Sequence, residues 1–205
     1  MEKSLKLTNS FSLNDINFSG FSTSENWVGY FERNKKFSFL LIEEAISLFD
    51  DFFKGKDENI IVLTALSYDD QRENDEEVIR KYNSLYEKMK SKRLLLPMTE
   101  NYENYLYGDS VLSADALNFS FARSDFVDIS KLMMCYAGVI GQVCFYINPS
   151  LNLAIYPHDD VGFGCISLNA DNNSAQDFLR YCSKNKNFNV FINDSKGLIK
   201  LESLN

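Results

Sequence analysis

The sequence predicts a single α+β domain, in which a mixed, mostly antiparallel sheet carries helices mainly on one face. Three observations lead to this prediction. A continuous β-branched run at residues 60–66 is typical of a buried central strand. Apolar residues recur at spacings of three and four in residues 42–53 and 78–92, as on one side of a helix. Short strands and turns fill residues 143–168, which predicts a C-terminal β-meander, and a helix is expected to follow it.

The N-terminal half is expected to alternate strands with helices. Residues 27–32 form a short run rich in aromatic side chains, which indicates a short first strand. The helix at 42–53, the buried strand at 60–66 and the helix at 78–92 follow in that order. Pro97 then stops the apolar run that precedes it, because proline lacks a backbone N–H.

The middle of the chain predicts one more strand and helix. Leu117, Phe119 and Phe121 alternate with smaller or polar neighbours, the period of a strand with one buried face. Ser124 is of a type that caps helices at the N-terminus, and Gly138 of the type that ends them. A helix is therefore expected between these two residues.

The C-terminal third is the most regular part of the pattern. Residues 143–147 and 151–156 flank an Asn-Pro-Ser turn and predict a hairpin, and residues 163–168 predict a third strand. Ser174 begins a sequence that resembles a capping box and predicts a helix. Residues 188–192 predict the last strand.

The chain is expected to form one domain with an N-terminal arm. Residues 1–26 are polar with isolated apolar side chains, which predicts an irregular arm held against a domain at residues 27–205. Three Pro and nine Gly leave little material for a flexible linker. No signal peptide follows the first residues, and the apolar stretch 139–147 is too short to span a bilayer. We therefore expect a cytoplasmic protein.

The net charge of -8 bears on the kind of partner. Nucleic acids and anionic membranes are bound by clustered Lys and Arg, so an acidic chain is expected to bind neither. A basic protein is a suitable partner, because complementary potentials speed association. The alternative is that the charge serves solubility.

The chain has four cysteines and one histidine, which limits the available chemistry. Each cysteine stands among apolar residues, as buried free thiols do, so no disulfide is expected. His158 could serve as a base for Cys144 or Cys165, but both lie in predicted strands, where burial raises the pKa of a thiol. We predict that the protein is not an enzyme.

His158, Asp159 and Asp160 could be ligands of a metal ion or members of a turn. Adjacent residues on a turn cannot all point at one ion, and the chain has no second histidine, so we predict a β-turn and no metal. Gly162 and Gly164 lack the spacing of a phosphate-binding loop and are expected to let a strand approach its neighbour. No cofactor is expected.

An acidic stretch at residues 69–77 is the main candidate for binding. The dipole of the following helix accounts for Glu76 and Glu77 at its start. It does not account for Asp69, Asp70, Glu73 and Asp75, which we take as candidate partner-binding residues, with Asp159 and Asp160 as a second patch. The alternative is a solvated loop.

The order of elements resembles a bacterial family, the domain-of-unknown-function 3885-like proteins. Four features carry this resemblance: an Ile-Glu-Glu-Ala sequence at 42–45, an acidic Phe-Phe ending at 48–53, the strand at 60–63, and a hairpin that ends in the acidic pair at 159–160. This chain departs from the family's Tyr-Asp-Asp-Arg-Gly sequence. Pro157 and His158 are inserted before the acidic pair, and Val161 replaces the arginine.

The chain also resembles the immunity proteins of bacterial toxin–immunity pairs, including those of contact-dependent growth inhibition systems. The resemblance implies that it binds a cognate toxin domain, which is expected to be basic and is a nuclease in many such pairs, and occludes its active site. Two alternatives stay open. One is a small-molecule or regulatory binding module, and the other is an enzyme that uses carboxylates such as Asp159 and Asp160.

Overall fold

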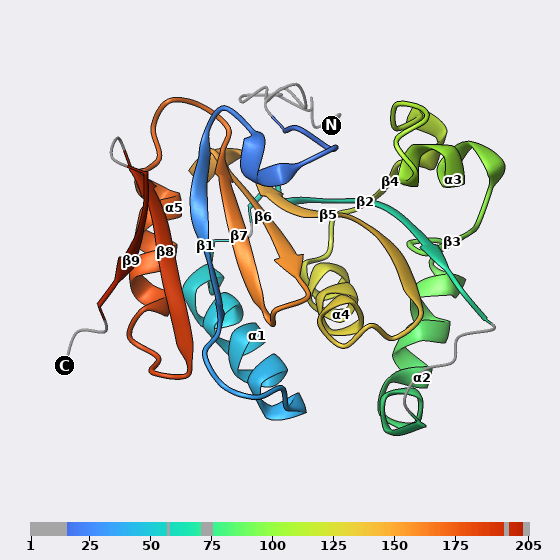
Figure 1. Ribbon diagram of the computed structural model, residues 1–205, viewed down its shortest axis with the longest axis horizontal. Helices are drawn as coiled ribbons and strands as arrows, with labels where there is room; N and C mark the ends of the chain where they lie inside the picture. Colours follow the sequence, from blue (N-terminus) through green and yellow to red (C-terminus); the bar gives the residue numbers. More distant parts are fainter. Residues whose placement is uncertain (1–15, 57, 71–75, 195–196, 203–205) are drawn as a thin grey trace, which may run out of the picture.

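We describe the protein from a computed structural model, which covers residues 16–56, 58–70, 76–194 and 197–202 of the 205-residue chain. In this part of the chain, nine strands form one open sheet in the order β3-β2-β5-β6-β7-β1-β8-β9, with β4 also paired to β2 (Figure 1). Strands β2 and β3 are parallel, and the other pairs are antiparallel. The predicted α+β fold with a mixed, mostly antiparallel sheet is confirmed.

The elements have the following bounds. The strands are β1 (Trp27–Arg33), β2 (Ile61–Tyr68), β3 (Leu96–Pro97), β4 (Asn118–Ser120), β5 (Val139–Asn148), β6 (Leu153–His158), β7 (Gly162–Ser167), β8 (Phe188–Asp194) and β9 (Gly197–Leu201). The helices are α1 (Phe39–Phe53), α2 (Glu76–Ser91), α3 (Glu100–Leu106), α4 (Arg123–Met134) and α5 (Asn173–Cys182), with short 3-10 turns η2 (Phe21–Thr23), η3 (Ala114–Ala116) and η4 (Pro149–Leu151).

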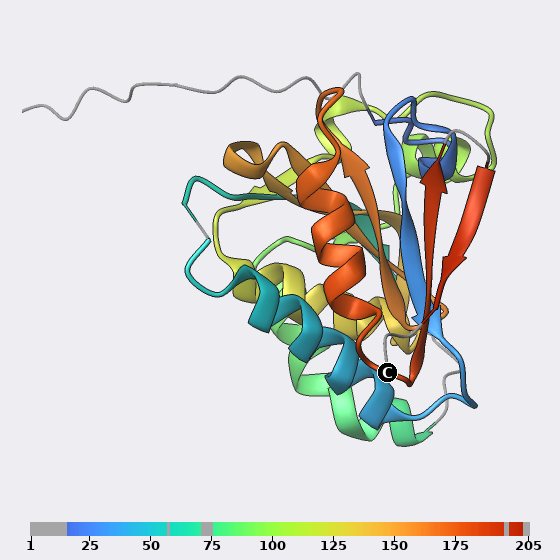
Figure 2. The same cartoon turned by 90° about the vertical axis from the view of Figure 1, so that its left-hand side faces the viewer.

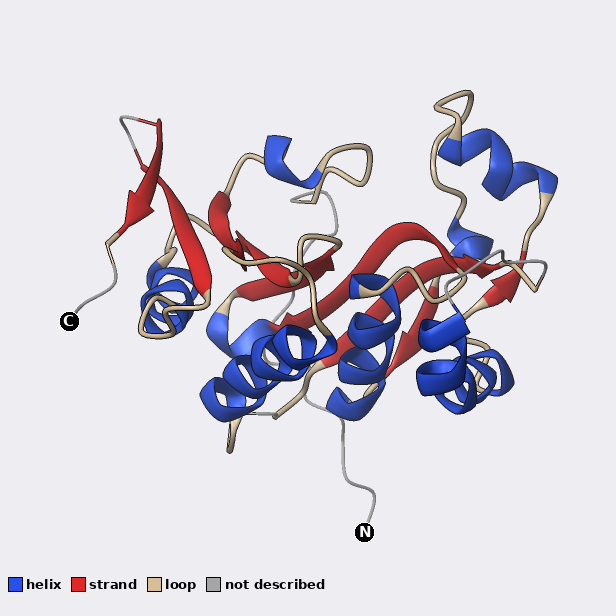
Figure 3. Cartoon of the chain, turned by 60° about the horizontal axis from the view of Figure 1, so that its bottom comes forward, coloured by secondary structure: helices blue, strands red, loops and turns tan. Residues whose placement is uncertain are grey.

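Helices α1, α2, α4 and α5 cover one face of the sheet (Figure 3), and Figure 2 shows α1 and α5 on that side together. The apolar residues of α1 are buried at the spacing of three and four that the sequence shows. Phe49 lies at the centre of this core, with its ring centroid 5.0 Å from those of Phe126 and Tyr146 and 5.3 Å from that of Phe163.

The other face of the sheet is covered by shorter segments. Ile16 and Phe21 from the N-terminal segment and Tyr102 from α3 are buried against it. Phe21 makes edge contacts with Phe145 and Tyr156, each at a centroid distance of 4.8 Å. Of the predicted arm, residues 16–26 therefore pack on the sheet, and residues 1–15 lie outside the described residues.

The C-terminal meander consists of β5, β6 and β7, and α5 follows it as predicted. Strands β8 and β9 come after α5, and no helix follows them in the described residues. Strand β9 and helix α3 were not expected from the sequence. Gly162 and Gly164 do allow close approach, because a Cβ at Gly162 would meet the Phe31 carbonyl and one at Gly164 would meet the Tyr156 ring.

Strand β4 differs from its prediction in which face it buries. Phe119 is 55% exposed and Phe121 is 76% exposed, although their alternation predicted a buried apolar face. The inward side is polar instead: the Ser120 hydroxyl donates to the buried Asp125 carboxylate at 2.5 Å, and Lys92 Nζ lies 2.5 Å from the same group. A satisfied polar cluster thus takes the place of the expected apolar one.

Two helix caps also differ from their predictions. Ala122 is the N-cap of α4, so Ser124 lies within the first turn, and α4 ends at Met134 rather than near Gly138. Asn172 precedes α5 without a side-chain cap, while the Asp171 carboxylate accepts the Asn173 amide at 3.1 Å. In the described part of the chain, the helices are too short or too polar for any of them to cross a membrane.

Candidate functional site

Strands β5 and β6 separate toward one end of the sheet. They pair at three positions, from Tyr146 with Ile155 to Asn148 with Leu153. Beyond these positions β5 stays paired with β2, while the end of β6 stays paired with β7 as far as His158. The two strands therefore follow different neighbours and leave a split in the sheet, which Figure 1 shows above α4.

A β-bulge in β5 gives a physical reason for this split. The register between β5 and β2 shifts between Ala65 and Ser67, so Gly141 and Gln142 together lie opposite one residue of β2. Bulges bend a strand and increase its twist. Gly141 has a φ of +99°, and a Cβ there would meet the Tyr102 hydroxyl, so glycine is required at this position.

A groove of about 1060 Å³ lies over the split, and we call it the β5–β6 groove. Its floor is formed by the start of β5 and the end of β6, together with Met133 and Tyr136 at the end of α4. One wall is the N-terminal segment around Phe18, and the other is the end of α3 and the loop after it. The Tyr105 hydroxyl donates to the Phe18 carbonyl at 2.8 Å and joins the two walls.

The lining of the β5–β6 groove combines exposed aromatic or apolar side chains with carboxylates. Tyr107 is 74% exposed, Val111 87% and Tyr136 61%. Asp109 and Asp159 are the acidic side chains in this lining, and no Lys or Arg of the described residues contributes to it. The groove therefore presents negative charge beside aromatic surface.

The turn between β6 and β7 holds the second predicted patch. It consists of Asp159, Asp160 and Val161, so the predicted turn is confirmed, although Pro157 and His158 belong to β6. The Tyr136 hydroxyl donates to the Asp159 carboxylate. The Arg33 amide donates to the Asp160 carbonyl at 3.0 Å, and the Arg33 guanidinium lies 3.6 Å from the Asp160 carboxylate.

Two of the five non-glycine residues with a positive φ in the described part of the chain lie at these contacts. Tyr136 has a φ of 54° and Val161 a φ of 56°, in the left-handed region that favours glycine. Such conformations cost on the order of 1–3 kcal/mol each and persist where the surroundings impose them. Val161 is fully buried in the core, and the Tyr136 hydroxyl is bonded to Asp159. Of the two, Tyr136 contacts Asp159 directly, and Val161 anchors the end of the same turn in the core.

His158, the last residue of β6, anchors the start of the turn through a hydrogen bond to β1. Its Nε2 lies 2.8 Å from the Phe31 carbonyl oxygen, and because a carbonyl accepts, Nε2 carries the hydrogen. Burial lowers the pKa of His158, against the opposing effects of the Phe31 carbonyl and of Asp159 and Asp160. Two effects raise the pKa of Tyr136 to about 12: the larger is desolvation of its hydroxyl, and the next is its hydrogen bond to Asp159. At neutral pH both side chains are therefore neutral hydrogen-bond donors.

The thiols are poor candidates for nucleophiles. Cys135, Cys144, Cys165 and Cys182 are all buried and free. Burial raises the pKa of Cys135 to about 12 and raises the pKa values of the other three as well. Thiols with such pKa values stay protonated at neutral pH, and the thiolate is the reactive form.

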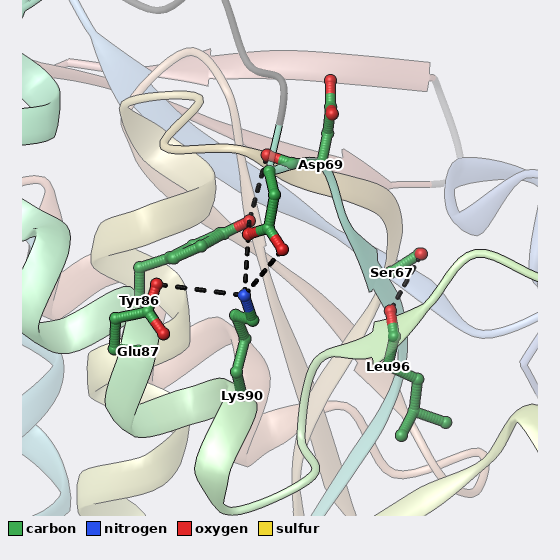
Figure 4. A network of polar contacts seen from close by, with 7 residues as sticks. Ser67, Asp69, Tyr86, Glu87, Lys90 and Leu96 are labelled. Carbon is green, nitrogen blue, oxygen red and sulfur yellow. Dashed lines mark hydrogen bonds and ion pairs between the residues drawn. The ribbon is translucent and has the colours of Figure 1, made fainter.

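The acidic stretch begins just after β2, where Figure 4 shows Asp69 near Tyr86 and Lys90 of α2. Lys90 Nζ lies 2.7 Å from Asp70 Oδ1, and the Tyr86 hydroxyl donates to this carboxylate at 3.2 Å and to the Asp69 carbonyl at 3.0 Å. Asp70 thus fastens the end of β2 to α2. The Asp69 carboxylate points away from Lys90 in Figure 4. Glu73 and Asp75 lie outside the described residues.

The described residues of the first patch, Asp69 and Asp70, lie at the same end of the sheet as the second patch. The Asp69 amide donates to the Gly138 carbonyl at 3.0 Å, and Tyr136, in the same turn, donates to Asp159. The turn after α4 thus connects the two patches. Asp109 and Tyr107 join the site from a segment that the sequence analysis left unassigned. Gly141 and Gln142 interrupt the apolar stretch 139–147 in the sequence and mark the position of the bulge.

No group of three or more His, Cys, Asp or Glu side chains among the described residues is arranged to hold a metal ion. Comparisons of the chain with protein-family models, with curated proteins and with solved structures gave no match.

Proposed function

We propose that this protein binds and neutralises a basic partner protein, as an immunity protein neutralises its cognate toxin domain by occluding the active site. The observation that carries the proposal is the β5–β6 groove, whose charged lining is acidic and whose rims expose Tyr107, Val111 and Tyr136. A nuclease toxin domain would supply the complementary surface, because its substrate-binding cleft must be basic to bind phosphates.

The chemistry of the groove supports a protein partner. Tyrosine is enriched at protein interfaces, since it offers a large apolar ring and one polar atom. Tyr107 and Tyr136 supply this type of surface on opposite sides of the groove. Carboxylates at the rim steer a cationic partner and disfavour anionic ones. The net charge of -8 strengthens the same field at longer range.

The fixed geometry of the acidic turn supports the proposal as well. Asp159 is held by Tyr136, and Asp160 is held by Arg33. A partner that binds these carboxylates does not have to order them first, which reduces the entropy cost of association. The candidates Asp69 and Asp70 lie at the same end of the sheet, where the charge of Asp70 is paired with Lys90.

The test is a binding titration against the purified cognate toxin domain, for which any toxin domain encoded by a neighbouring gene is the first candidate. In Asp109→Lys/Asp159→Lys, association should slow by roughly tenfold or more, and the loss should shrink at high salt. The matched control is Asp51→Lys/Asp177→Lys, which changes the net charge equally with exposed acids on α1 and α5. A toxin domain that forms no complex with the wild-type protein would refute the proposal.

A small-molecule binding module is the second candidate. The groove volume of about 1060 Å³ is at the upper end of the range for ligand sites. Such a ligand would be a cation with an aromatic group, because the lining combines carboxylates with exposed tyrosine rings. Binding of a small cation that raises the melting temperature, together with failure of the toxin titration, would favour this candidate over the first.

A further inference from the structure

We infer that the partner enters the β5–β6 groove as an extended, cationic segment, which lies along the unpaired edge of β5 and places a Lys or Arg side chain between the carboxylates of Asp109 and Asp159. This inference rests on the proposed function, since it specifies which part of a basic partner the groove accepts. It follows from three properties of the groove: a strand edge, a shape and a charge.

The strand edge is the first property. Residues 139, 140 and 143–145 of β5 pair with β2, with the bulge at 141–142 between them, and no strand of the described chain pairs with residues 139–145 on their opposite side. An unpaired edge presents backbone N–H and C=O groups that can pair with an added strand. Four residues, 139–142, line the groove and would match an extended segment of about 13 Å at about 3.3 Å per residue.

The bulge at Gly141 and Gln142 sets the length of this edge. Bulges break a regular ladder, and they protect edges from indiscriminate pairing. The edge of β5 is therefore suited to a short segment and not to a long strand. The facing residues of β6, Tyr156 to His158, are held by β7 and border the segment on its other side.

The shape of the groove is the second property. The N-terminal segment and α3 stand on the same side of the sheet (Figure 3), and residues of both line the groove. Their bond from Tyr105 to Phe18 closes the space between the walls at one point. A floor with a wall on each of two sides favours a single extended segment over a flat protein surface.

Charge is the third property, and it selects the side chains. Asp109 and Asp159 are both exposed, come from the loop after α3 and from the turn after β6, and have no Lys or Arg of the described residues beside them in the lining. The exposed rings of Tyr107, at the end of α3, and of Tyr136, in the turn after α4, line the same groove. Cations are attracted both by carboxylates and by the faces of aromatic rings, so a Lys or Arg side chain satisfies the site in two ways.

The experiment uses a synthetic probe, an eight-residue peptide of alternating Val and Lys, and the full-length protein. The peptide should bind to the wild-type protein, and its affinity should fall roughly tenfold when alternate backbone nitrogens are methylated, because methylation removes the N–H groups that pair with a strand. A similar fall is expected with Asp109→Lys/Asp159→Lys, and no fall beyond twofold with the control Asp51→Lys/Asp177→Lys. Amide hydrogen exchange should slow at residues 139–142 when the peptide is bound.

Each arm has a result that overturns the inference. Equal weakening by both charge-reversal pairs would show general attraction to an acidic protein. An affinity unaffected by N-methylation, or unchanged exchange at residues 139–142, would exclude strand pairing, and absence of binding would exclude the segment itself. The proposed function fails separately: a peptide that binds as described, with a toxin domain that does not bind, refutes the immunity role and retains the groove as a site for cationic segments.

Discussion

The two faces of the sheet are built in different ways. On the helix-covered face, rings from three elements meet around Phe49, which is fully buried. On the groove face, Phe21 and Tyr102 cover part of the sheet, while Tyr107 and Val111 remain 74% and 87% exposed. Burial of apolar surface is the main stabilising contribution to a fold. We therefore expect the helix-covered face to supply most of the stability and the groove face to bind the partner.

The largest expected difference between the faces is in stability. Phe49→Ala should lower the free energy of unfolding by about 3–5 kcal/mol, because it leaves a cavity among well-packed rings. Tyr107→Ala should change it by about 0.5 kcal/mol or less, since the residue is exposed. Urea denaturation of the two variants measures both values. A comparable loss in Tyr107→Ala would show that the groove rim is part of the core.

A pH effect is expected next in size, and it comes from the groove face. The pKa of His158 is lowered by burial, so below the unfolded-state value of 6.5 the unfolded chain binds a proton that the folded chain does not. Stability should then fall as the pH drops below 6.5, by at most about 1.4 kcal/mol per pH unit, until the pH reaches the folded-state pKa.

His158 is the one histidine in the sequence, which makes the pH effect assignable. His158→Gln can keep a donor near the Phe31 carbonyl while it removes the titration. The difference in unfolding free energy between pH 7 and pH 5.5 should therefore be smaller in this variant than in the wild type. Parallel curves for the two proteins would mean that His158 does not stay neutral in the fold.

Tyr102→Phe tests how firmly the groove wall is attached to the sheet. The Tyr102 hydroxyl donates to the Ala65 carbonyl at 2.5 Å and is buried beside Gly141. Loss of this bond should cost about 1 kcal/mol, because a buried carbonyl loses its partner. Thermal unfolding measures the cost. If α3 positions Asp109, the affinity for the peptide should fall in this variant as well. An unchanged affinity would show that peptide binding does not depend on how α3 is attached to the sheet.

The smallest expected effect on stability belongs to the residues with the largest expected effect on binding. Asp109→Lys/Asp159→Lys should change the free energy of unfolding by about 0.5 kcal/mol or less, since both carboxylates are exposed. Circular dichroism melts of this variant and of Asp51→Lys/Asp177→Lys should nearly coincide. A large destabilisation of the groove pair alone would show that these acids support the fold, contrary to the comparison.

The sequence determined the elements with strong periodicity. Residues 42–53 and 60–66 became α1 and β2 because their apolar spacing matches the helix and the buried strand. The turn at Asp159 and Asp160 followed from local turn chemistry. Phe119 was misassigned because alternation identifies two faces of a strand without showing which one is buried, and Ser120 was the residue that met a buried partner, Asp125.

Tertiary structure alone decided the site. Strands β5 and β6 are consecutive and would be expected to pair along their length, but the pairing of β5 with β2, the bulge at Gly141 and the pairing of β6 with β7 separate them. Asp109 and Asp159 line one groove although 50 residues separate them in the sequence. Periodicity reports on contacts within an element, and a site formed between elements depends on long-range pairing that no local pattern contains.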